Sequence, residues 1–116
     1  MQMLRFKLFD AVEEPMIVYN RVAIIDKAME FYTEECDTET NFTFPSYASS
    51  YFRVFNERLG FEIKDIALSQ SGASLIINAS VLDLTFDDNG VYFYEVGYVQ
   101  TGGYEVPLKY GPLQVV

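Results

Sequence analysis

The sequence has no histidine and no tryptophan, and it has only one cysteine. Histidine is the commonest general base and the commonest metal ligand, so its absence disfavours enzymatic and metal-dependent functions. The lone Cys36 cannot form an internal disulfide, and its acidic neighbours Glu34, Glu35 and Asp37 disfavour the thiolate that a nucleophile requires. We therefore expect a protein that is not an enzyme, with no catalytic residue, no cofactor and no metal site.

Basic residues and long apolar runs are also scarce. Eight Lys and Arg stand against 17 Asp and Glu, which gives a formal net charge of −9. That charge repels phosphate backbones and anionic lipids, so we expect no nucleic acid and no membrane among the partners. No apolar run approaches the roughly 20 residues of a membrane helix, and residues 1–7 alternate instead of forming the core of a signal peptide. The acidity fits either a basic partner or simple solubility.

What the sequence does have is a strand-forming composition. Half of its 116 residues are hydrophobic, and they include ten Phe and nine Tyr. Aromatic and β-branched residues favour strands, and a chain of this length forms one domain with a core of its own. We therefore expect a single β-sandwich domain over residues 1–116.

The pattern along the chain has a period near two, with turn signals between the apolar segments. Such spacing is typical of a sandwich or barrel, and adjacent hairpins imply antiparallel pairing. We expect an all-β fold of about seven to nine strands, either a sandwich or a barrel. A short strand at 28–32, and a helical turn or a strand at 81–86, remain alternatives. The expected strands span residues 4–9, 16–25, 40–44, 51–56, 61–66, 75–78, 91–99, 104–110 and 113–116, with a break in the last segment at Pro107 and Pro112.

One short motif has the spacing of a tyrosine corner. In immunoglobulin-type sandwiches, such a Tyr follows a tight turn at the start of the penultimate strand, and its hydroxyl bonds back to the main chain. Here Asp88, Gly90 and Tyr92 supply the turn, the glycine and the Tyr. Together with the strand pattern, this motif favours an immunoglobulin-like antiparallel β-sandwich. The alternative is an ordinary loop before an aromatic strand.

Tyrosines also crowd the C-terminal hairpin. Along 91–99, Tyr92, Tyr94 and Tyr98 share one face, while Val91 and Phe93 share the other. If the tyrosines face outward, they form a stripe suited to protein contacts, because Tyr is enriched at interface hot spots. If Tyr92 forms the corner, the same face must point inward. We name as possible interface residues Tyr94, Tyr98, Tyr104 and Tyr110.

Strands and turns follow one another in a characteristic order over roughly residues 40–116, in the segments 40–44, 51–55, 61–63, 73–77, 90–98, 104–108 and 111–116. This order resembles a known family. It is similar to the immunoglobulin-like N-terminal domain of bacteriophage upper baseplate proteins and of related virion fibre or decoration proteins. The first 39 residues fit this pattern less closely, so an added hairpin or an anchoring arm is expected there.

This resemblance implies a non-enzymatic structural component of a virion, in the baseplate, tail fibre, neck or capsid decoration. It implies that the partners are other virion proteins and further copies of the chain, and that the protein is made in the host cytoplasm and resides in the virion. The alternative is a ligand- or carbohydrate-binding module of a bacterial protein. The absence of tryptophan counts against sugar binding.

Overall fold

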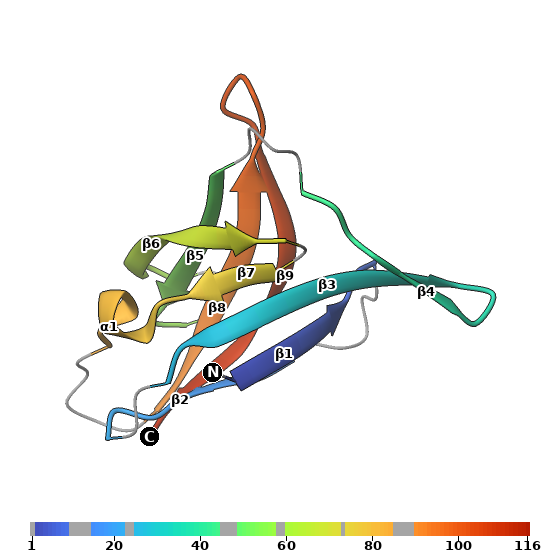
Figure 1. Cartoon of the computed structure of the whole chain (residues 1–116). Helices are drawn as coiled ribbons and strands as arrows, with labels where there is room; N and C mark the ends of the chain where they lie inside the picture. The colour runs from blue at the N-terminus through green and yellow to red at the C-terminus, as the bar shows by residue number, and fades with distance from the viewer. Residues whose placement is uncertain are drawn as a thin grey trace.

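The computed structural model describes residues 2–9, 15–22, 25–44, 49–57, 60–72, 74–84 and 90–116. Over these ranges the chain is almost entirely β-structure, with one short helix (Figure 1). No helix in these ranges is both long enough and apolar enough to cross a lipid bilayer. The elements are β1 (Gln2–Lys7), β2 (Ile17–Tyr19), β3 (Lys27–Glu35), β4 (Thr38–Asn41), β5 (Ser49–Phe55), β6 (Glu62–Ser71), β7 (Ser74–Ile77), α1 (Ala79–Leu82), β8 (Gly90–Val99) and β9 (Glu105–Val115).

The strands form a single curled sheet with the order β1-β3-β7-β6-β5-β8-β9-β2, and β4 pairs with the outer half of β3. The sheet bends at β6, whose first part pairs with β5 and whose last three residues pair with β7. The half that contains β1, β3 and β7 therefore lies across the half that contains β5, β8 and β9 (Figure 1). This arrangement confirms the predicted all-β, sandwich-like fold and its number of strands.

Two pairs at the margins of the sheet are parallel, whereas the sequence pattern predicted antiparallel pairing. β1 runs parallel to β3, and β2 runs parallel to β9. The reason is the path of the chain between β1 and β3. It crosses to the opposite end of the sheet to form β2 and then returns, and only such a crossover lets two strands run in the same direction.

The N-terminal third contributes directly to the core. Phe6, Ile17, Tyr19 and Phe31 are each at most 3% exposed, and all of them pack into the main hydrophobic cluster. An arm separate from the core therefore does not describe β1, β2 and the first part of β3. The outer part of β3 and all of β4 do project from the body as an exposed hairpin (Figure 1).

Aromatic rings in the core contact one another both within and between the two halves of the sheet. Phe6 of β1 packs on Phe31 of β3, with ring centroids 5.5 Å apart. Phe52 of β5 stacks on Tyr94 of β8 at 5.6 Å, and Tyr94 in turn stacks on Phe6 at 6.4 Å. Aromatic pairs at these separations are favourable beyond their burial, so these rings connect β1 and β3 with β5 and β8.

The last strand is continuous, although the sequence predicted a break. β9 runs from Glu105 to Val115 through both Pro107 and Pro112. The irregularity is instead a shift of register opposite β8, where Val96 pairs with Lys109 and Gly97 pairs with Pro107. A bulge of this kind absorbs the local irregularity without ending the strand.

The segment predicted as either a helical turn or a strand forms the helix α1, shifted towards the N-terminus. Asn78 precedes this helix, and its side-chain oxygen accepts hydrogen bonds from the backbone N–H groups of Ser80 and Val81. Helix N-termini leave such donors unpaired, and an asparagine at this position satisfies them. The cap explains why four residues form a helical turn beside a sheet.

Replacing Asn78 with alanine should lower the free energy of unfolding by about 1 kcal/mol, because the capping oxygen is lost. Urea unfolding of the purified chain, followed by circular dichroism, measures this loss. Asn78→Asp keeps an acceptor oxygen and should unfold at nearly the wild-type urea concentration. Equal losses for the two variants would show that the loss does not arise from the missing acceptor oxygen.

Candidate functional site

The tyrosines of the C-terminal hairpin divide between the core and the surface. Tyr94 is 1% exposed and Tyr98 is 7% exposed, so of the two alternatives the inward orientation holds for both. Both lie on the inner face of β8, where Tyr94 stacks on Phe52, whereas Val91 on the opposite face is 54% exposed. Tyr104 and Tyr110 lie on the surface, 74% and 55% exposed. Only these last two are placed where a partner could touch them directly, and their role at an interface stays a prediction.

The predicted tyrosine corner is only partly visible. Asp88 lies outside the described residues, and Gly90 begins β8. Tyr92 is half-buried and packs against the core, which is the inward orientation that a corner requires. The corner itself stays a prediction.

The neighbouring Tyr94 forms a hydrogen bond to the backbone of a segment that is distant in sequence. The Tyr94 hydroxyl donates a hydrogen bond of 2.5 Å to the carbonyl oxygen of Pro15, two residues before β2. This bond links β8 to the entry of β2, which lies at the end of the same half of the sheet. Tyr94 therefore acts as an internal anchor of the fold, not as a contact for a partner.

The outer face of β5, β8 and β9 carries aromatic and charged side chains in adjacent rows. The strand registers place Phe55 beside Phe93, and Phe93 beside Pro112. The next row on the same face lies two residues further along each strand and consists of Asp65, Arg53, Glu95 and Tyr110. An apolar row therefore lies directly beside a charged row on a face that no other layer of the described chain covers.

The apolar part of this face is hollowed into a groove of about 470 Å³. We call it the outer aromatic groove and define it by Phe55, Phe93, Pro107 and Tyr110. Phe55 and Phe93 are half-buried, and Tyr110 is exposed. Concave apolar surface of this kind is a common feature of sites that bind a partner.

The charged part of this face is organised around one guanidinium. Arg53 Nε lies 3.4 Å from Glu62 and 3.1 Å from Asp65, and its Nη1 lies 3.4 Å from Glu95. Nη1 and Nη2 donate to the two oxygens of Glu105, a bidentate pair. We call these four carboxylates the acidic cluster. One cation among four anions leaves this side of the groove negative.

The same guanidinium covers an aromatic ring. Arg53 Cζ lies 4.0 Å from the centre of the Tyr51 ring, a cation–π contact that holds the side chain flat on the sheet. Burial, and then the charge of Glu95, raise the pKa of Tyr51 above its usual value. The Tyr51 hydroxyl therefore stays protonated. Hydrogen bonding to Arg53 lowers the pKa of Glu105, so this carboxylate stays charged at neutral pH.

Replacing Arg53 with glutamine should destabilise the fold more at pH 7 than at pH 3. The lowered pKa of Glu105 means that its pairing with Arg53 stabilises the fold above the usual carboxyl pKa. This contribution is lost as the pH falls through the folded-state pKa. Urea unfolding of wild type and R53Q at both pH values measures the difference.

Arg5→Gln is the matched control for that experiment. Arg5 pairs with Glu30 at 3.5 Å and with Glu39 at 3.1 Å, but its side chain is 44% exposed, against 20% for Arg53. Exposed pairs contribute at most about 1 kcal/mol, so R5Q should lose less stability than R53Q at pH 7. A loss for R53Q that does not change with pH would contradict the assigned role of the carboxylates.

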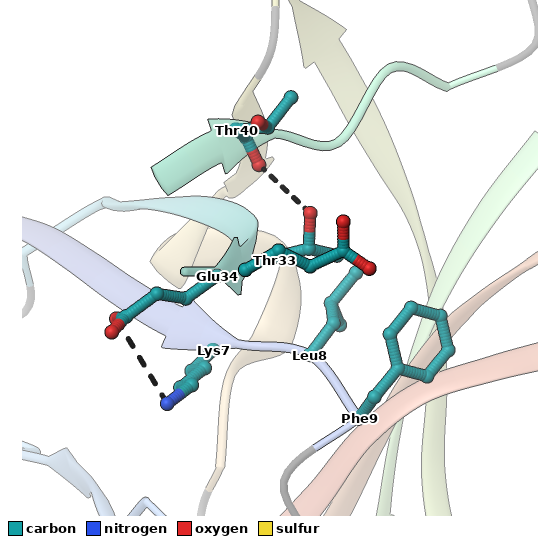
Figure 2. A pocket seen from close by; sticks show the side chains of 7 residues that line it. Lys7, Leu8, Phe9, Thr33, Glu34 and Thr40 are labelled. Atoms are coloured by element: carbon teal, nitrogen blue, oxygen red, sulfur yellow. Dashed lines mark hydrogen bonds and ion pairs between the residues drawn. The ribbon is translucent and has the colours of Figure 1, made fainter. Parts of the chain in front are cut away.

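A second recess lies where β1 ends beside the β3–β4 hairpin, and Figure 2 shows its side chains. It has a volume of about 740 Å³, and Lys7, Phe9, Thr33 and Glu34 are among its lining residues. Lys7 Nζ and Glu34 lie 3.9 Å apart, and the Thr33 hydroxyl donates to the Thr40 carbonyl oxygen at 3.4 Å (Figure 2). Lys7 and Thr33 thus have partners within the recess, whereas the Phe9 side chain is 90% exposed.

Sequence reasoning missed the residues that define the outer face. Arg53, Phe55 and Phe93 were read only as members of strands, although alternation does place Tyr51, Arg53 and Phe55 on one face of β5. Their partners come from β6, β8 and β9, so the cluster depends on register between strands. In the part of the chain that the structure describes, no three Cys, Asp or Glu side chains are grouped so that they could hold a metal ion.

Comparison with known proteins gives one finding about the fold. No protein-family model matches the sequence, and the search of curated proteins returned no match. Among solved structures, the chain is similar to the N-terminal domain of phage TP901-1 ORF48, with a TM-score of 0.54 and 11% sequence identity. The similarity covers 99% of this chain and 98% of that domain. The chain therefore shares, over its whole length, the fold of a domain from a phage protein.

Proposed function

We propose that the chain is a non-enzymatic structural component of a bacteriophage virion and that it acts through contacts with other proteins. The observation that carries the proposal is the likeness to a phage protein domain, which extends over 99% of this chain and 98% of that domain. An end-to-end match means that the two folds correspond as whole units. Because a shared fold is a weak guide to function on its own, the surface of the chain supplies the second support.

The surface supports binding to a protein. The outer aromatic groove and the exposed Tyr104 and Tyr110 offer aromatic side chains, which are enriched at protein interfaces. The sequence has no histidine for general acid–base chemistry. We propose the baseplate, tail fibre, neck or capsid decoration as the location, with other virion proteins and further copies of this chain as partners.

The proposal predicts an assembly defect when the chain is missing. A stop codon in its gene, in the phage that encodes it, should yield incomplete particles, and wild-type chain supplied from a plasmid should restore them. Electron microscopy and plaque counts provide the two measurements. Complete, infectious particles without the chain would reject a structural role.

A ligand-binding module is a second candidate, and Phe9 is the observation that favours it. Its ring is 90% exposed at the recess shown in Figure 2, and its backbone has a φ of 60°, which is uncommon for a residue with a side chain. An exposed ring beside polar groups can stack on a sugar. Binding on a glycan array that is lost in Phe9→Ala would support this candidate, and the absence of binding to any glycan would reject it.

A further inference from the structure

We propose that the outer aromatic groove binds a segment of a different protein that presents an apolar side chain next to lysine or arginine. This inference names the chemistry of the partner, and it rests on the proposed function for the view that the partner is another virion protein. It is carried by two features of one face: the apolar groove itself and the negative charge along its side.

The apolar residues of the groove determine which kind of side chain can bind in it. Phe55 and Phe93 form its floor as neighbours across β5 and β8, and Pro107 and Tyr110 bound it on β9. Tyr110 is 55% exposed, so water covers apolar surface that an inserted side chain would bury. Burial of apolar surface is the main favourable contribution to protein association. The groove is therefore suited to an aliphatic or aromatic anchor.

The acidic cluster determines which residues of the partner lie beside that apolar side chain. Arg53 is the cation that the acidic cluster surrounds, so the cluster keeps an excess of negative charge. The side chains of Glu62, Asp65 and Glu105 are 48%, 42% and 44% exposed, so their outer surfaces can still receive a cation. Complementary charge at a rim steers association and selects the partner.

The same charge disfavours the other occupants of the groove. A second copy docked face to face would bring its own acidic cluster against this one, on top of a formal net charge of −9 for each chain. Nucleic acid and anionic lipid are repelled for the same reason. A basic protein segment is the occupant that the charges favour.

Access to the groove from the side is also open. On the side away from β8, β9 pairs with β2 only through Leu113–Val115, so within the described residues the stretch with Pro107 and Tyr110 lies at the margin of the sheet. A partner segment can therefore reach the groove without displacing a strand.

A library of random 12-residue peptides displayed on yeast, panned on the purified wild-type chain, tests this proposal without requiring the natural partner. The enriched peptides should carry an apolar residue flanked by Lys or Arg. Their binding should weaken about tenfold or more in Tyr110→Glu, since a hot-spot aromatic is replaced by a charge. It should also weaken as salt increases.

Val81→Glu is the matched control, because Val81 of α1 is 53% exposed, close to the 55% of Tyr110, and lies outside the groove. It should bind the peptides as wild type does, and both variants should melt near the wild-type temperature. The proposal is overturned by an absence of enrichment, by peptides without basic residues, or by equal binding to Tyr110→Glu and wild type. Wild-type dimers in sedimentation that Tyr110→Glu abolishes would assign the groove to a second copy and overturn it too.

The peptide selection and the presence of the chain in particles test the groove and the proposed function separately. Specific basic peptides together with absence of the chain from particles would reject the proposed function and retain the groove. Failure of the peptide selection, with the chain present in particles, would reject the groove and retain the function.

Discussion

Replacing Phe52 with alanine is expected to lower the free energy of unfolding by about 3–5 kcal/mol. Phe52 is fully buried on β5, and its ring stacks on Tyr94 with an angle of 11° between the planes. Alanine would remove the apolar contacts and leave a cavity between the two halves of the sheet. Because the total stability of a small domain is about 5–15 kcal/mol, this one change should bring the chain close to unfolding.

Two further variants show whether the loss arises from the core. Phe52→Leu keeps most of the volume and should lose less than F52A, because the cavity is smaller. Phe61→Ala changes a side chain that is 82% exposed, and its effect should stay within about 0.5 kcal/mol. Urea unfolding followed by circular dichroism measures all three. Similar midpoints for F52A and F61A would contradict the position of Phe52 in the core.

Replacing Gly97 with alanine is the second change with a large expected effect, a loss of about 1–3 kcal/mol or more. A Cβ at this position would lie 2.5 Å from the carbonyl oxygen of Val106 and 2.9 Å from Cα of Pro107. Both neighbours are backbone atoms of β9 at the register shift, so they cannot rotate away. The strand pair β8–β9 would have to separate locally to admit the methyl group.

The third contact at Gly97 provides an internal control. The same Cβ would lie 2.7 Å from the Tyr51 hydroxyl, which Tyr51→Phe removes. The double variant G97A/Y51F should therefore lose less stability than the sum of the single losses, since the two residues are in contact. Thermal unfolding of the four proteins gives the coupling. A G97A variant that melts at the wild-type temperature would show that β9 does not approach β8 so closely.

Much of the fold follows from short-range patterns in the sequence. The strand expected at residues 4–9 overlaps β1, and of the alternating apolar residues there Phe6 and Leu8 are buried. The predicted strand 91–99 corresponds to β8 with nearly the same bounds. These elements were predictable because a strand with one buried face displays that face in its own residues.

Other features depend on partners that are distant in sequence. The strand expected at 61–66 continues in β6 through residues 69–71, because β7 pairs with them. Pro107 was expected to interrupt the last strand, yet the register shift opposite Gly97 accommodates it. The parallel pairing of β1 with β3 depends on the crossover through β2. No local pattern encodes such pairings.

The candidate site was likewise predictable from the sequence only in part. The abundance of Tyr in the C-terminal hairpin led to the prediction of Tyr110 as an interface residue, and Tyr110 lines the groove. Which face of β8 points outward could not be decided from its residues, because both faces are apolar, and Tyr94 and Tyr98 proved to be buried. The cluster around Arg53 joins β5, β6, β8 and β9, so it becomes visible only once the registers are known.

Quantitative mass spectrometry of purified particles from the phage that encodes this chain tests the central claim most directly. A structural component should be present at a fixed number of copies per particle, matched to the symmetry of the substructure that holds it. Its ratio to the major virion proteins should stay constant through successive purification steps. Absence of the chain from the particles, or a ratio that falls towards zero as purification proceeds, would contradict a structural role in the virion.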